Sequence, residues 1–381
     1  MSSPHQTRVV AIVLAAVVAL AAAVAGGALI SQQFGDEQTS PSSTFAAVVN
    51  SANGQGASVP THPVSAPPTS TTSTTTGRVT VESVTVVDLN RDARGFALVG
   101  GVLHIAGASY WRVPLTASNA LVPAPAPTDA RAHLDVARSA AGSEVVALPL
   151  QPRVPLLIDA VASGWDAHSF AQFIASDGAG GAVTAGANLG GTVERRSKGK
   201  PGHSAIFALE SDSKATALVA SASLVAVGTD RGAVRTADLN GSGSTVVRAS
   251  GECPVIAVAI DSTQTKLAVL ASNGDITLYR LSDRARVAST GPINGTCGPN
   301  VETLTGALLF DGGLLIGAGS GPDIRVLRAT NKGGFDTVAN LVGHDNTVVD
   351  LGLRLEDQTL VSMDRGGHVL AWPLPGVFFK E

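Results

Sequence analysis

The sequence predicts an all-β fold, a β-propeller of seven four-stranded blades, preceded by one N-terminal transmembrane helix and a disordered linker. Three observations predict this organisation: an apolar run near the N-terminus, a Ser/Thr/Pro tract after it, and a recurring pattern of short strands in the rest of the chain. The 381 residues are only 15% charged and include 42 Gly. Because average proteins are about 25% charged, this composition favours buried strands and turns over helix surfaces.

The C-terminal half repeats one arrangement of strands and turns. In the clearest copy, the apolar segments 255–260 and 266–271 come first. The turn Ser272-Asn273-Gly274 follows, and then the alternating segments 275–281 and 285–289. Runs of four to eight apolar or alternating residues bounded by Gly, Asn or Asp are typical of strands. One copy therefore predicts four strands, which is one blade.

Three other copies keep this order, and their predicted third strands can be aligned. The aligned positions stand 42, 48 and 45 residues apart, at Val234, Ile276, Ile324 and Val369. A period of about 40–45 residues with short strands and Gly/Asp turns is typical of propeller blades.

The N-terminal half contains weaker copies. Val183 falls in the same aligned column, 51 residues before Val234. Segments 103–106 and 110–113 predict another blade, and 144–148 is the best strand of one more. This count gives seven blades, and the degeneracy of these copies leaves six or eight open.

A closed ring needs a strand that joins the last blade to the first, since an unpaired edge invites aggregation. The last copy ends soon after its third strand, at Pro373 and Pro375. The apolar run 79–89 could supply the missing outer strand. We therefore predict that residues 79–89 close the ring and are protected from hydrogen exchange.

The last copy also carries a motif, with Gly343-His344 first, then Ser362, and then Trp372 before Pro373. In this respect the chain resembles the WD-repeat family, over roughly residues 214–375. The resemblance implies that His344, Ser362 and Trp372 belong to a buried hydrogen-bonded set that makes the blade rigid. The pattern departs from the family at the turn Asp, six residues before Trp372, where this chain has Gly366. The fold assignment therefore rests more on the repeats than on the motif.

The apolar run Val9–Ile30 is uncharged and 22 residues long. A helix of this length spans about 33 Å, close to the ~30 Å hydrocarbon core. Arg8 precedes the run, whereas Asp36 and Glu37 follow it. Because positive flanks stay inside, we expect residues 1–8 in the cytoplasm, a signal-anchor helix at 9–30, and the propeller outside the cell membrane. A signal peptide cleaved near Ala23-Val24-Ala25, giving a secreted protein, is the alternative.

Residues 31–77 change abruptly in composition and end in the Ser/Thr tract 69–76. Such a segment cannot bury enough apolar surface to offset the entropy of ordering. It is therefore predicted to be a disordered Ser/Thr/Pro-rich linker between the membrane helix and a propeller at residues 78–381.

Cys253 and Cys297 are the only cysteines. Each lies in the loop before the first strand of its blade, in adjacent copies. Neighbouring blades bring equivalent loops together, and an extracytoplasmic compartment is oxidising. We therefore predict a Cys253–Cys297 disulfide; the alternative is two free thiols.

Several other residues and motifs could form binding or catalytic sites, and for each of them we compare that interpretation with a purely structural role. The segment Asp88–Asp92 has alternating oxygen ligands but lacks the Gly and Glu of a calcium loop, so a turn is favoured. Trp165 could stack on a sugar, but packing is favoured. The basic cluster 195–200 is interpreted as a solvated loop. The eight His show no metal-binding spacing, and no nucleophile-elbow or phosphate-binding motif occurs. We expect no cofactor and no metal.

The net charge of −4 offers no basic face for nucleic acid. The first hypothesis is a non-catalytic, membrane-tethered scaffold that binds another envelope or secretion-associated protein. The alternative is an extracytoplasmic enzyme or small-ligand (sugar) binder that uses the central channel. The alternative requires acidic or His residues that converge where the innermost strands begin, and a channel mouth ringed by three or more would favour it.

Overall fold

The computed structural model describes residues 81–115, 127–138, 145–151, 155–157, 165–167, 170–248, 253–292, 297, 306–311, 313–319, 321–330 and 334–379. The predicted cytoplasmic segment, transmembrane helix and linker lie outside these residues. In the part of the chain that is described, no helix has the length and hydropathy of a membrane span. The contacts divide the chain into Met1–Thr69 and Ser70–Glu381, and every described strand belongs to the second unit.

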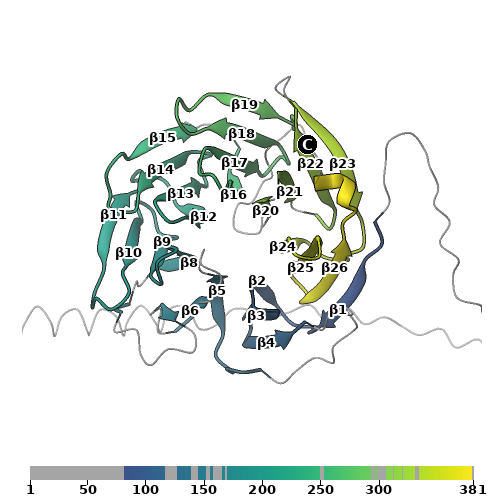
Figure 1. The fold of residues 1–381 in the computed structure, drawn as a ribbon. Helices are drawn as coiled ribbons and strands as arrows, with labels where there is room; N and C mark the ends of the chain where they lie inside the picture. Colours follow the sequence, from purple (N-terminus) through teal and green to yellow (C-terminus); the bar gives the residue numbers. More distant parts are fainter. Residues whose placement is uncertain are drawn as a thin grey trace, which may run out of the picture. The chain divides into compact units, whose positions relative to one another are not determined.

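The described strands form seven antiparallel sheets around one channel (Figure 1). Two sheets have three described strands, namely β2 (Ala93–Val99), β3 (Val102–Gly107) and β4 (Tyr110–Pro114), and β5 (His133–Arg138), β6 (Val145–Pro149) and β7 (Leu156–Leu157). Four sheets consist of consecutive strands, namely β8 (Ala171–Ser176), β9 (Ala182–Gly186), β10 (Thr192–Arg196) and β11 (Ser204–Ala208); β12 (Ala215–Ala220), β13 (Leu224–Thr229), β14 (Val234–Asp238) and β15 (Thr245–Arg248); β16 (Val255–Ile260), β17 (Lys266–Ala271), β18 (Ile276–Arg280) and β19 (Arg286–Ser289); and β20 (Ala307–Asp311), β21 (Leu314–Ala318), β22 (Ile324–Ala329) and β23 (Phe335–Leu341).

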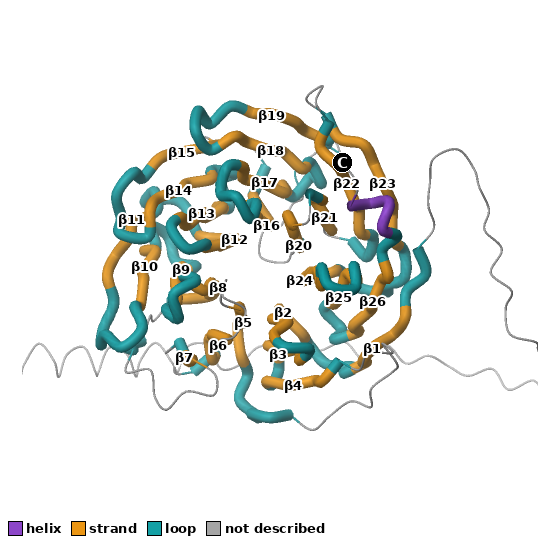
Figure 2. Tube along the Cα trace, in the orientation of Figure 1, coloured by secondary structure: helices purple, strands orange, loops and turns teal. Residues whose placement is uncertain are grey.

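The last sheet combines both ends of the propeller. It contains β24 (Val348–Arg354), β25 (Thr359–Asp364), β26 (His368–Pro373) and, outermost, β1 (Val84–Asp88). β1 lies within the predicted segment 79–89 and pairs antiparallel with β26, so the predicted closure is confirmed for Val84–Asp88. The 3-10 helix Gly376–Phe379 follows β26 (Figure 2).

The fold is therefore an all-β propeller, as predicted. The prediction that every blade has four strands is met by five sheets, since the first two have three strands among the described residues. The alignment of Val183 was wrong. Val183 belongs to β9, the second strand of its sheet, whereas the aligned Val234 begins the third strand, β14. The glycine-rich turn 178–181 follows the innermost strand here, so it misled the alignment.

The core lies between neighbouring sheets. The second strand of each sheet is deeply buried, and β6, β9, β21 and β25 are buried at every position. Strands covered on both faces read as continuous apolar runs, and full burial of a Val, Leu or Ile contributes about 1.5–3 kcal/mol. Each innermost strand contacts the innermost strand of the next sheet, and β24 contacts β2, so the ring is closed.

Bulges in the innermost strands decide what faces the channel. The register of pairing to the second strand shifts after the first residue in β2, β5, β8, β12, β16 and β24. A bulge leaves one residue unpaired and turns the chain locally. As a result, both the second and the third residue of each of these strands line the channel.

Candidate functional site

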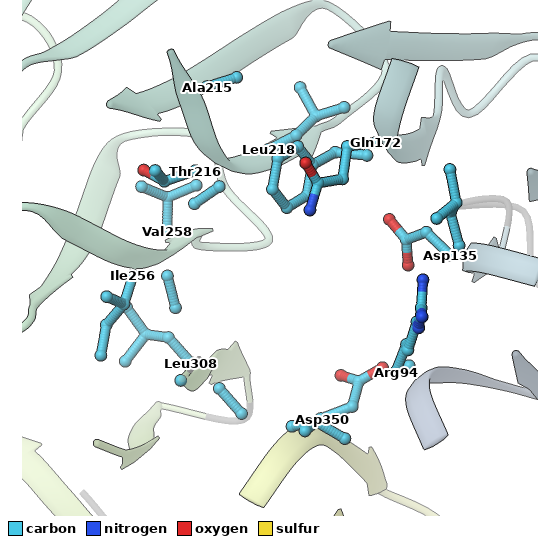
Figure 3. Close-up of a pocket in the computed structure, with 18 of the residues that line it drawn as sticks. Arg94, Asp135, Gln172, Ala215, Thr216, Leu218, Ile256, Val258, Leu308 and Asp350 are labelled. Carbon is cyan, nitrogen blue, oxygen red and sulfur yellow. The ribbon is translucent and has the colours of Figure 1, made fainter. Parts of the chain in front are cut away.

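The central channel holds a cavity of about 900 Å³. The residues that line it are charged on one side of the ring and apolar on the other. Figure 3 shows Asp135, Arg94 and Asp350 on one side, and Ile256, Val258 and Leu308 on the other. The charged side chains come from the adjacent strands β5, β2 and β24, whereas the apolar ones come from β16 and β20. The cavity therefore has a polar wall and an apolar wall.

Asp135 and Asp350 are the third residues of β5 and β24, and β2 lies between these strands in the ring. Asp350 Oδ2 accepts the amide N–H of Phe96 on β2 at 2.7 Å, and Asp135 Oδ2 accepts that of Ile174 on β8 at 2.9 Å. Each carboxylate also accepts the amide of its own following residue, at 2.8 Å. These side chains therefore tie each sheet to the next one.

Gly95 is the third residue of β2 and lies between the two carboxylates. A Cβ atom at Gly95 would be 3.1 Å from Asp135 Oδ1 and 3.5 Å from Asp350 Oδ2, with no other non-neighbouring atom within 4 Å. Because Gly has no side chain, this position is open to the channel. Two carboxylate oxygens from different sheets thus face one open point, which we call the Gly95 cradle.

Both carboxylates have perturbed pKa values. Burial raises the pKa of Asp135 to about 7, and the Asp350 charge adds to the shift, whereas the amide bonds from Ile174 and Val136 oppose it. Burial likewise raises the pKa of Asp350 to about 7, against the amide bonds from Phe96 and Leu351. Perturbed carboxyl groups that converge in a cavity are typical of binding and catalytic sites.

Other charged groups line the same channel. Arg94 Nε donates to Asp92 Oδ2 at 3.2 Å, and Arg365 Nε lies 3.6 Å from Asp92 Oδ1. Asp230 Oδ1 accepts the amide N–H of Lys214 at 2.8 Å. Among the described residues, three carboxylates line the cavity, Asp135, Asp230 and Asp350, which is the number that favours a function of the channel, but only Asp135 and Asp350 converge on one point.

A second polar cluster is buried in the last sheet. His344 Nε2 lies 2.7 Å from Ser362 Oγ, and Trp372 Nε1 donates to the same Oγ at 2.7 Å. His344 Nδ1 lies 3.3 Å from Asp364 Oδ2. The WD-repeat pattern expects this Asp at position 366, which is Gly. Asp364, two residues earlier and the last residue of β25, makes the contact instead.

Asp364 completes this cluster with bonds inside the turn. Its Oδ1 accepts the amides of Gly366 and His368, at 2.9 and 3.1 Å. Burial acts to raise the pKa of Asp364, but the hydrogen bond from His344 and the amide of His368 outweigh it and lower the pKa. Ligand-type atoms of His344, Asp364 and His368 all lie within 4.8 Å of one another, a proximity that sequence spacing did not predict. The hydrogen bonds among these residues account for the group as a structural network.

The predicted disulfide is confirmed, because Cys253 and Cys297 are bonded and their Cα atoms are 5.1 Å apart. Cys253 lies just before β16, and Cys297 lies between β19 and β20. The bond therefore links the loops that lead into two adjacent innermost strands.

Two of the weaker candidate sites have structural roles. The Asp88–Asp92 segment is the turn between β1 and β2, where Asp88 Oδ1 accepts the amide of Asn90 at 3.0 Å. Trp165 is buried, and its indole N–H donates to the Ser197 carbonyl at 3.2 Å, which favours packing over sugar stacking.

The basic cluster 195–200 is only partly a solvated loop. Arg195 and Arg196 belong to β10. Arg195 pairs with Asp177 at 2.8 Å, and the fully buried Arg196 donates to Glu194 Oε2 at 3.0 Å and to Thr184 Oγ1 at 2.8 Å. Sequence reasoning missed the Asp177 pair because that carboxylate lies in the turn after β8, and it missed the Glu194 pair although Glu194 stands on β10 two residues before Arg196.

Sequence reasoning also missed the Gly95 cradle. The signal was present, since Asp135 and Asp350 each stand at the third position of a strand with an apolar residue on either side in the sequence. Only the closure of the ring brings them together.

Comparisons with known proteins identify the fold and nothing further. No protein-family model matches the chain, and no curated protein matches it. Among solved structures, the chain is similar to the crystal structure of the computationally designed Ika8 protein, with a TM-score of 0.51 and 14% sequence identity. The match covers 76% of this chain and 100% of the designed one.

Proposed function

We propose that this chain is a non-catalytic protein-interaction scaffold, a WD-repeat-like propeller tethered to the membrane outside the cytoplasm, which binds another envelope or secretion-associated protein. The observation that carries this proposal is a pair of large apolar side chains on the face where the innermost strands begin, which we call the strand-start face. Phe170 and Leu189 are each 57% exposed. Exposed apolar groups that lie together are typical of interaction sites.

The two side chains belong to neighbouring segments of one sheet. Phe170 directly precedes β8, and Leu189 lies in the turn between β9 and β10. The amide of Ala187 donates to the Phe170 carbonyl at 2.9 Å, which holds the two segments together. Val342, 70% exposed, lies in the loop from β23 to β24, which ends on the same face.

The WD-repeat likeness is supported by the buried network of His344, Ser362 and Trp372, with Asp364 in place of the expected turn Asp. The extracytoplasmic location is supported by the apolar run 9–30 and by the disulfide, since disulfides persist in oxidising compartments.

Capture from solubilised membranes tests the scaffold function. The bait is the full chain, compared with Phe170→Asp/Leu189→Asp and with Leu355→Asp, which changes an exposed Leu in the β24–β25 turn on the opposite face. We expect one specific protein to bind the wild type and the Leu355 variant and to be lost with the double variant. Equal recovery of that protein with all three baits would show that Phe170 and Leu189 do not form its binding surface.

A second candidate function is small-ligand binding in the central channel. The specific observation that favours it is the convergence of two perturbed carboxylates in a cavity with an opposing apolar wall. A thermal-shift screen of small compounds tests it, with Gln172→Trp as a variant that narrows the channel. We expect a compound that stabilises the wild type and not the variant; if every stabilising compound acts equally on both, the channel is not the site.

A further inference from the structure

We propose that the last sheet binds a Zn²⁺ ion through three side chains, His344, Asp364 and His368, at the strand-start face. Ligand atoms of these residues all lie within 4.8 Å of one another. Two imidazoles and one carboxylate are a ligand set that zinc commonly takes in proteins. The site lies outside the central channel and goes beyond the scaffold function, and it reverses the expectation from His spacing that no metal is bound.

The three ligands come from neighbouring segments of one sheet. His344 lies in the loop that leads into β24, Asp364 is the last residue of β25, and His368 is the first residue of β26. β25 runs antiparallel to both β24 and β26. The end of β25 and the starts of the other two strands therefore meet at one edge of the sheet, and the fold brings the three side chains together.

The contact between His344 and Asp364 has the length expected for two ligands of one ion. His344 Nδ1 is 3.3 Å from Asp364 Oδ2, whereas a charge-assisted hydrogen bond is typically about 2.7–2.9 Å long. Zinc binds imidazole nitrogen and carboxylate oxygen at about 2.0–2.2 Å, so two such ligands at the tetrahedral angle are about 3.3–3.6 Å apart. The ion therefore fits these two atoms at their present separation.

His368 supplies the third ligand from the solvent side. The side chains of His344 and Asp364 are buried, whereas His368 is partly exposed. The ring of His368 lies edge-on to that of His344, with 5.9 Å between the ring centroids. A rotation of this partly exposed ring closes the remaining gap in the group, and its exposure gives the ion a path from solvent. Three protein ligands leave the fourth position to water.

The groups behind the ligands hold them as a zinc site requires. A metal-bound histidine donates its other ring N–H to an acceptor that fixes the ring. His344 Nε2 lies 2.7 Å from Ser362 Oγ, and His368 Nε2 lies 3.4 Å from Thr85 Oγ1. Asp364 Oδ1 accepts two backbone amides, which leaves Oδ2 for the ion.

The same side chains serve a metal-free and a metal-bound form. In the metal-free form, His344 Nδ1–H donates to Asp364 Oδ2 and Nε2 accepts the Ser362 hydroxyl. When Zn²⁺ binds at Nδ1, the imidazole proton moves to Nε2 and is donated to Ser362 Oγ. The bond from the Trp372 indole to this Oγ is kept in both forms. The buried network therefore does not have to break for the ion to enter.

The charges around the group favour a cation. The exposed carboxylates of Asp88 and Asp345 adjoin the ligands, the first through the pairing of β1 with β26 and the second in the chain. Arg365, the nearest cation along the chain, has its Nε 3.6 Å from Asp92 Oδ1. A carboxylate and two further acids therefore face the site, while the neighbouring guanidinium is engaged elsewhere.

A bound ion clamps the sheet that closes the ring. It joins the loop before β24 to β25 and β26, and β26 carries the closing strand β1. The same loop holds Val342, which is 70% exposed on the strand-start face. The ion would therefore stabilise ring closure and fix one part of that face.

Zinc titration of the full chain tests the proposal. The detergent-solubilised chain, purified without a histidine tag and freed of metal with a chelator, is titrated with ZnCl₂ by calorimetry and with CoCl₂ by visible absorption. His368→Gln and Asp364→Asn each remove one ligand. The matched control is His203→Gln, which changes an exposed His that also contacts a carboxylate, Asp166, in another part of the ring.

We expect the wild type and the His203 variant to bind Zn²⁺ with equal affinity, and the two ligand variants to bind it at least about tenfold more weakly. Zn²⁺ should raise the Tm of the first two chains, because an ion that binds the folded state stabilises it. With chelator present, His368→Gln should melt at the wild-type temperature, since it leaves the buried network of His344, Ser362 and Trp372 in place; this separates loss of the metal from loss of the fold.

Three results would overturn the proposal. The first is a wild type that binds no Zn²⁺, and the second is equal affinity in the wild type and His368→Gln. The third is a Co²⁺ spectrum of the wild type that equals that of the ion in water, because Co²⁺ held by imidazole and carboxylate ligands has a stronger and shifted absorption.

Discussion

Single side chains at the second and third positions of the innermost strands decide what faces the channel. Four of the six bulged strands place an apolar or small residue at the third position, Gly95, Phe173, Ala217 and Ala257. Asp135 and Asp350 are the exceptions, and they lie on either side of the glycine. Gly95, Asp135 and Asp350 therefore make one side of the channel a candidate binding site, whereas the rest of this ring of third positions has only a structural role.

The raised pKa values of Asp135 and Asp350 predict how stability depends on pH. Both groups titrate at about 7 in the folded chain, above the usual value near 4 for an Asp. Between these values the folded state binds protons that the unfolded state has released, so stability falls as pH rises. From about pH 5 to 8.5 we expect each group to contribute a loss on the order of 1–3 kcal/mol, seen as a lower Tm.

The double variant Asp135→Asn/Asp350→Asn is the control for this pH dependence, because it removes the titration and keeps one acceptor oxygen at each position, where each Asp uses both of its oxygens to accept backbone amides. Its Tm should change less over the same pH range. An identical pH slope in the variant and the wild type would mean that other groups cause the change.

The buried hydrogen-bond network of the last sheet predicts that removing the Ser362 hydroxyl lowers the free energy of unfolding. Ser362→Ala leaves the Trp372 indole N–H and His344 Nε2 without the Ser362 oxygen that both contact. Unsatisfied buried polar groups cost about 1–3 kcal/mol, so urea denaturation should show a loss of this size. Ser211→Ala, in an exposed turn, should have little effect, and an equal loss in both variants would contradict the role of the network.

At the scale of elements, one strand holds the ring closed. β1 is far from β26 in the sequence but pairs with it in the last sheet. Burial changes along β1, whose pairing with β26 shifts in register between Thr85 and Val87. Val86 and Val87 are buried, whereas Val84 is 42% exposed.

This burial predicts that Val87→Asp opens the ring and that Val84→Asp does not. A charge at the fully buried Val87 has no partner, and such burial costs several kcal/mol. In Val87→Asp, hydrogen exchange of the β1 and β26 amides should become fast, while Val84→Asp keeps wild-type protection. Slow exchange in both variants would show that burial of Val87 is not what holds β1 against β26.

At the scale of the whole molecule, the propeller is held by closure of the ring and by one covalent link. The disulfide encloses the sheet of β16 to β19 and ends before β20. It therefore links two adjacent sheets in the folded state and closes a loop of the chain in the unfolded state.

Loss of the disulfide should lower the stability of the propeller. For a loop closed over 44 residues, the chain-entropy model gives about 4 kcal/mol as an upper value. Cys253→Ser/Cys297→Ser should therefore melt at a lower temperature than the oxidised wild type. A reductant should lower the Tm of the wild type alone; a reductant without effect on it would contradict a stabilising role.

Much of the architecture could be predicted from the sequence because strands and turns are encoded locally. The segments 255–260, 266–271 and 314–318 coincide with β16, β17 and β21, since apolar runs between Gly and Asp turns need no distant partner to be recognised. The closing strand and the disulfide could be predicted for a related reason. Both follow from the repeat itself, which places equivalent loops and edges side by side.

The candidate site was decided only by the tertiary structure. Asp350 and Phe96 are 254 residues apart and are joined by a 2.7 Å hydrogen bond, and Gly95 lies between two carboxylates from opposite ends of the propeller. Burial of Arg196 and the use of Asp364 in place of Gly366 also depend on neighbouring strands. The sequence by itself determined a ring of strands, because side-chain alternation and turn chemistry are local. Ring closure determined which distant side chains share an environment, and with it their charge state and the ligands they can bind.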